Sequence, residues 1–97
     1  MRLTQTKVNG TWLRAAELEW RRGAKCPDGY DIRQGIRLMV SESGKVMFRL
    51  RTGRMAWEDD GMLIRHPDRI SGYDTFADAA AAADAIYAEY GLDPSLI

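Results

Sequence analysis

The sequence predicts an α+β fold: an antiparallel β-meander of three to four strands, a C-terminal helix packed on one face, and a second helix near the N-terminus. Residues on both sides of the segment Glu42-Ser43-Gly44 alternate between apolar and polar, as strands with one buried face do. An alanine-rich run stops at Gly91, a residue type that commonly ends helices. The length of 97 residues fits one domain, 1–97, with a single modest core.

The first quarter of the chain allows two interpretations. Residues 1–10 are expected to form an extended arm or a short strand, because they alternate loosely and end at the turn-forming pair Asn9-Gly10. Over Thr11–Arg22 the alanine, leucine, glutamate and arginine residues favour a helix that Gly23 ends. A strand is the alternative, since several apolar side chains also recur with a period of two. These are Trp12, Ala16, Leu18 and Trp20.

The segment Gly35–Arg51 predicts a β-hairpin whose register follows from its turn. A three-residue loop, Glu42-Ser43-Gly44, with Gly44 in the left-handed conformation, pairs Ser41 with Lys45. With that pairing, both strands agree on which face is buried. The core face carries Ile36, Leu38 and Val40 opposite Leu50, Phe48 and Val46. The other face carries Arg37, Met39 and Ser41 opposite Arg49, Met47 and Lys45.

Two further strands are expected after this hairpin. A turn at Thr52-Gly53 would start a third strand, Arg54–Glu58, and would place Trp57 on the core face opposite Phe48. An acidic turn ending at Gly61 would then lead to a shorter fourth strand, Met62–His66.

The C-terminal helix has the clearest signals. Thr75 can cap its start, and Asp78 lies in the first turn, where the helix dipole favours negative charge. One stripe of the helix is apolar or small and would face the sheet. It contains Phe76, Ala79, Ala80, Ala83, Ile86, Tyr87 and Tyr90. We expect this stripe to cover Val40, Val46, Phe48 and Trp57, which leaves the arginines of the hairpin on the opposite face.

Charge is distributed unevenly along a chain whose net charge is zero. All 14 basic residues lie within residues 1–69 together with 9 acids, whereas residues 70–97 hold 5 acids and no base. A basic sheet face could bind phosphates, and two methionines would add an adaptable apolar pair in its middle; alternatively, the charges only solvate an outer face. The candidate nucleic-acid or partner-binding residues are Arg37, Met39, Lys45, Met47, Arg49, Arg51 and Arg54.

The residue patterns that catalysis and metal binding require are missing from the sequence. His66 and Cys26 are the only residues of their types, and the sequence contains neither a nucleophile elbow nor a phosphate-binding loop. The acidic run Glu58–Asp60 is expected to be a solvated turn rather than a magnesium site. We therefore predict a non-enzymatic protein without cofactor or metal. One cysteine and the lack of a signal-peptide or membrane-spanning pattern are typical of a cytoplasmic protein with no membrane partner.

Three pieces of the sequence resemble a known type of DNA-binding domain. The segments “GIR”, “GKVMFRLR” and “YDTFADAA” are similar to the ethylene-response-factor domain and to the related arm domain of phage integrases, over about half of the chain. The resemblance implies a three-stranded antiparallel sheet with a helix behind it, and binding of the DNA major groove through the sheet. It places Gly35–Arg37, Gly44, Lys45, Arg49 and Arg51 on the first two strands and Tyr73–Ala80 at the start of the helix.

The sequence thus predicts a binding module that engages nucleic acid through a basic sheet face. The alternative is a small phage or mobile-element inhibitor, of the anti-CRISPR or anti-restriction type, that binds a protein or nucleoprotein complex. The chain resembles such proteins in size and composition, and its C-terminal acids could occupy a cationic groove on the target. These acids are Asp74, Asp78, Asp84, Glu89 and Asp93. The oligomeric state is left open.

Overall fold

Five strands form one antiparallel sheet in the computed structural model, which describes residues 4–8, 11–15, 19–40 and 42–96, with side chains from residue 20 onward. Strands β3, β4 and β5 lie side by side in that order. The long β5 pairs with β6 near its C-terminal end and with β7 near its N-terminal end. The strands are β3 (Glu19–Lys25), β4 (Asp31–Val40), β5 (Val46–Trp57), β6 (Leu63–Arg65) and β7 (Arg69–Tyr73).

The described residues of the N-terminal quarter of the chain form strands, so the helix predicted over Thr11–Arg22 is wrong. β1 (Thr4–Val8) and β2 (Thr11–Ala15) make a separate antiparallel hairpin, in agreement with a short strand within residues 1–10. The last residues of the predicted helix belong to β3, which pairs with β4 along its whole length. A complete ladder of hydrogen bonds outweighs a helix propensity that amounts to less than about 1 kcal/mol per residue. The strand alternative is therefore correct.

The register predicted for the hairpin of β4 and β5 is confirmed. Ile36 lies opposite Leu50, Arg37 opposite Arg49, and Met39 opposite Met47. Gly44 has a φ of 84°, the left-handed conformation that this three-residue loop requires. The predicted partnership of Ser41 with Lys45 lies outside the described residues.

β5 does not turn at Thr52-Gly53, so the predicted third strand is the continuation of β5. Thr52 and Gly53 pair with Gln34 and Arg33 because β4 begins at Asp31, early enough to hold β5 straight. Alternation then sends Trp57 to the face away from the helix, where it is 68% exposed, and not into the core as predicted. The acidic turn and the fourth strand are confirmed: Gly61 has a φ of 82°, and β6 follows.

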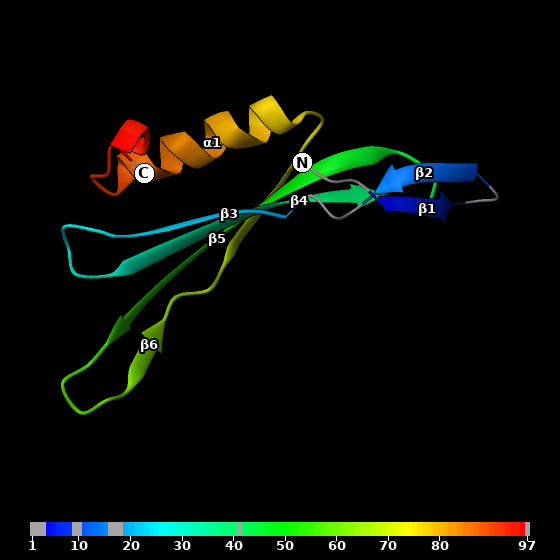
Figure 1. Cartoon of the computed structure of the whole chain (residues 1–97). Helices are drawn as coiled ribbons and strands as arrows, with labels where there is room; N and C mark the ends of the chain where they lie inside the picture. Colours follow the sequence, from blue (N-terminus) through cyan, green and yellow to red (C-terminus); the bar gives the residue numbers. More distant parts are fainter. Residues whose placement is uncertain (1–3, 9–10, 16–18, 41, 97) are drawn as a thin grey trace.

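Helix α1 (Phe76–Glu89) lies across one face of the sheet (Figure 1) and is followed by the short helix η1 (Pro94–Leu96). The backbone N–H of Asp78 donates to Thr75 Oγ1 at 3.1 Å, and Gly91 follows the helix with a φ of 80°, so both predicted helix ends are confirmed. The described part of the chain contains no helix long and apolar enough to cross a bilayer.

The core lies between α1 and the sheet. Ala79 and Ala83 are fully buried against Ile36 and Leu50, since small side chains let the helix approach the strands closely. Phe48 packs at the edge of this cluster, as predicted, whereas Val46 is 36% exposed because it lies at the end of β5. A second cluster near the C-terminal end of α1 consists of Cys26, Ile32 and Tyr87.

Candidate functional site

The sheet face opposite α1 carries a regular array of arginine and glycine residues. In the register of β3, β4 and β5, one row reads Arg21, Gly35, Arg51. The adjacent row reads Gly23, Arg33, Gly53. A third row pairs Arg37 with Arg49. We call this surface the arginine face and define it by Arg21, Arg33, Arg37, Arg49, Arg51 and Arg65.

These side chains enclose a shallow groove of about 730 Å³. Gly23, Gly35 and Gly53 also line it; Gly23 and Gly35 leave their backbone accessible because glycine has no side chain, whereas Gly53 is buried. A Cβ at Gly35 would meet only ordinary contacts, the closest being the Trp20 carbonyl oxygen at 3.7 Å. A Cβ at residue 35 would therefore project into the groove without clashing with the protein.

One acid, Asp68, reaches into the groove and pairs with Arg51 and, at 3.8 Å, with Arg65. Its other oxygen, Oδ1, lies 2.8 Å from where a Cβ on Gly53 would stand, so the glycine makes room for this carboxylate. Among residues whose side chains are described, no acid pairs with Arg33, Arg37 or Arg49, although Glu19 stands across from Arg37 in the register. Among the side chains that the structure describes, the charge of these three arginines is therefore not compensated by an ion pair.

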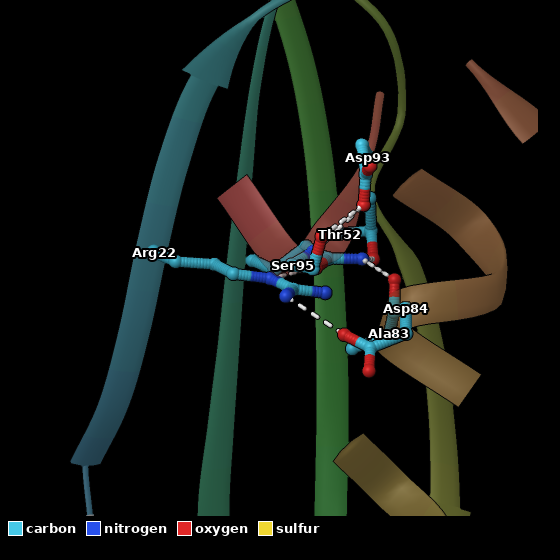
Figure 2. Close-up of polar contacts among 7 residues, drawn as sticks. Arg22, Thr52, Ala83, Asp84, Asp93 and Ser95 are labelled. Atoms are coloured by element: carbon cyan, nitrogen blue, oxygen red, sulfur yellow. Dashed lines mark hydrogen bonds and ion pairs between the residues drawn. The ribbon is translucent and has the colours of Figure 1, made fainter. Parts of the chain in front are cut away.

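Arginines on the helix side of the sheet are arranged differently, because they are paired and stacked. Figure 2 shows Arg22 reaching from β3 to Asp84 of α1, with Nη1 2.8 Å from the carboxylate. Its guanidinium lies 3.9 Å from the ring centroid of Tyr87 and donates through Nε to Gln34 at 2.8 Å. Gln34 in turn donates to the Ala83 carbonyl oxygen at 2.9 Å. This network joins α1 to the sheet.

Arg54 is the one predicted binding residue that the structure places on the helix side. Because β5 is continuous, successive side chains point to opposite faces of the sheet. Arg51 and Gly53 lie on the open face, and Arg54 therefore points toward α1. Its guanidinium pairs with Asp28 and lies 3.9 Å from the ring centroid of Tyr90. The hydrogen bond from Arg54 holds the pKa of the Asp28 carboxyl below its usual value, and burial raises the pKa of the neighbouring Cys26 thiol.

The remaining predicted residues lie beside the groove or on its rim. Met39 and Met47 face each other across β4 and β5 and are half-buried. The Met47 methyl group occupies the space that a side chain at Gly72 of β7 would need. Lys45 lies within 3.7 Å of Asp74, which reduces the charge it offers to a partner.

Sequence reasoning missed Arg21, Arg33 and Arg65. The first was assigned to a helix, and Arg33 lay before the predicted start of the hairpin. The alternation of Arg33, Gly35 and Arg37 was the signal that β4 starts earlier and that its outer face is basic.

The residues considered for catalysis or metal binding do not form a site. His66 is exposed, and its ring centroid lies 5.2 Å from that of Tyr30. The acidic run is a turn in which Asp60 accepts a hydrogen bond from the Met62 backbone N–H at 2.8 Å. No group of three potential metal ligands occurs within the described ranges. Comparison of the chain with protein-family models, curated proteins and solved structures found no match.

Proposed function

We propose that the protein binds nucleic acid through the arginine face and acts without catalysis. The observation that carries this proposal is the contrast between the two sides of the sheet. Arg22, Arg54 and Arg69 on the helix side each have a carboxylate partner, whereas Arg33, Arg37 and Arg49 of the open face have none among the described side chains. Positive charge that the fold does not neutralise is available to an anionic partner.

Arginine and glycine together suit a phosphate backbone. A guanidinium offers up to five donors in a fixed fork that matches phosphate oxygens, and it stays charged at any physiological pH. Gly23 and Gly35 let a bulky polymer approach the strands closely, whereas Asp68 fills the space over Gly53. The glycines also space the cations, so that Arg33 lies between two glycines. The resemblance to sheet-based DNA-binding domains supports the same mode, with Arg37, Arg49 and Arg51 as shared positions.

The alternative, an inhibitor that presents an acidic surface to a protein or nucleoprotein target, has less support from the contacts. Three of the five C-terminal acids are engaged within the protein: Asp74 with Lys45, Asp84 with Arg22, and Glu89 with Arg69. Neutralised carboxylates attract a cationic target weakly. Nuclease treatment before a pull-down separates the alternatives, since a partner retained without nucleic acid would favour the inhibitor.

The central test compares equal charge changes on the two sides of the sheet. We expect Arg33→Gln to weaken oligonucleotide binding about 5- to 10-fold, the effect of losing about 1 kcal/mol of phosphate contact. Arg69→Gln, which removes the same charge from the helix side, should leave affinity unchanged. Fluorescence anisotropy of labelled single-stranded and duplex oligonucleotides at low salt measures both. Equal losses in the two variants, or no binding by the wild type, would contradict the proposal.

A second variant tests the shape of the groove without altering charge. Gly35→Val fits the strand, because a Cβ there meets only ordinary contacts and β-branched residues favour strands. Its side chain would stand between Arg21 and Arg51 and keep a phosphate backbone away from the sheet. We expect unchanged or higher thermal stability together with weaker binding. Retained affinity would show that the open space over Gly35 is unimportant for binding.

A further inference from the structure

An exposed tryptophan stands on the same face as the groove. Trp57 is the last residue of β5, and its side chain is 68% exposed. Among the described residues, it is the one aromatic residue in the set of exposed large hydrophobic side chains. It pairs in register with Leu63 of β6, which is 41% exposed, and Met62 beside it is 58% exposed. Because register partners point to the same face, Trp57 and Leu63 form an apolar patch at the end of the β5–β6 hairpin, and Met62 precedes it in the turn.

The fold does not cover this patch. Trp57 points to the face away from α1, and Figure 1 shows the β5–β6 hairpin diverging from the helix. Exposed apolar groups at the end of a hairpin contribute nothing to the core. A cluster of large apolar side chains in water is typical of a binding surface.

The patch continues the groove. Alternation places Trp57 on the face that carries Met55, which is paired with Arg65, and both Met55 and Arg65 line the groove. Same-face neighbours along a strand are separated by about 7 Å, so an indole ring lies one step beyond the last guanidinium. The open face thus combines a row of cations with an aromatic platform at one end.

We infer that the ligand of this face is single-stranded nucleic acid, with one unpaired base stacked on Trp57 and the adjoining phosphates held by the arginine face. This inference rests on the proposed function and narrows it. A positively charged groove that follows the backbone, with an aromatic ring for a base, is the combination that single strands require. In a duplex the bases are already paired and stacked, so the indole would gain no partner.

The test compares single strands with duplexes of the same length. Wild type should bind the single strand more tightly. Trp57→Leu should lower single-strand affinity about 5- to 150-fold, the usual effect of losing one base stack, and Trp57→Phe should lose less. Duplex affinity should change little in either variant. Leu96→Ala, which removes an exposed apolar side chain of η1 and not of the arginine face, is the matched control and should bind as wild type does.

The outcomes separate this inference from the proposed function. If arginine variants weaken binding but Trp57→Leu does not, the basic face binds nucleic acid and the stacking site is wrong. If neither single strand nor duplex binds, the proposed function fails first. A wild-type dimer in sedimentation that Trp57→Leu dissociates would assign the patch to a second copy and overturn the inference. Circular dichroism melting of each variant verifies that the fold is intact.

Discussion

At the scale of single residues, the arginine face is nearly free of direct repulsion, with one exception. Arg33 lies between two glycines and Arg51 lies across from Gly35, but Arg37 and Arg49 stand directly opposite each other. Like charges in such a pair destabilise a sheet by roughly 0.2–1 kcal/mol. We expect Arg49→Gln to raise the free energy of unfolding by about that amount at low salt, and the gain to shrink as salt screens the pair.

Urea denaturation at two salt concentrations measures this change, and Arg33→Gln provides the comparison because glycines flank that residue. A loss of stability in Arg49→Gln would mean that the guanidinium makes a contact which outweighs the repulsion. If the stability gain is accompanied by weaker oligonucleotide binding, the pair is a site where the protein gives up stability for function.

The sequence identified some residues of the face because strand alternation is a local property. Arg37, Arg49 and Arg51 follow from the hairpin register alone, and they are where alternation predicted. The prediction that Arg54 lies on the basic face was wrong. The face to which Arg54 points depends on whether the chain turns at Thr52-Gly53, and the pairing of Gly53 with the distant Arg33 keeps the strand straight there. The alternation is reliable only within an uninterrupted strand.

At the scale of secondary-structure elements, the Arg54 side chain fastens three pieces of the structure together. It extends from β5, pairs with Asp28 in the loop between β3 and β4, and stacks on Tyr90 at the end of α1. The hydrogen bond from Arg54 lowers the pKa of Asp28 from the ordinary value of 3.8. A carboxyl with a lowered folded-state pKa stabilises the fold above its unfolded pKa, and this contribution is lost as the pH falls through the folded pKa.

We therefore expect Asp28→Asn to unfold at a lower temperature than wild type at neutral pH, and the difference to shrink as the pH falls into the acid range and through the lowered pKa of the folded-state carboxyl. Thermal denaturation by circular dichroism across this pH range gives the comparison. The sign is fixed, since protonation removes the same charge that the substitution removes. A difference that persisted unchanged in acid would assign the effect to loop geometry instead.

Elements whose signals lie close together in sequence were predicted well, and those that depend on distant partners were not. Thr75 and Gly91 bracket α1 because caps act within one turn. β7 was not predicted; it is a strand because it pairs with the N-terminal part of β5, which lies far from it in the sequence. Residues 19–25 form a strand because β4 is long enough to pair with all of them.

At the scale of the whole molecule, zero net charge is compatible with a basic binding face because the charges are separated in space. Acids of the C-terminal segment lie on or near α1, and Asp84 and Glu89 are paired with arginines of the helix side. Layers of secondary structure stack about 10 Å apart, while the Debye length at physiological salt is about 8 Å. A phosphate chain on the open face is therefore largely screened from the acidic side.

The salt dependence of binding measures how many arginines of this face act together. Each phosphate contact on a single strand contributes about −0.7 to the slope of log affinity against log salt, so six arginines would give a slope of about −4. Arg33→Gln should make the slope shallower by about 0.7, and Arg69→Gln should leave it unchanged. Anisotropy titrations across several salt concentrations give the slopes. A slope near zero would mean that binding releases no counterions, and it would contradict phosphate contacts by the arginine face.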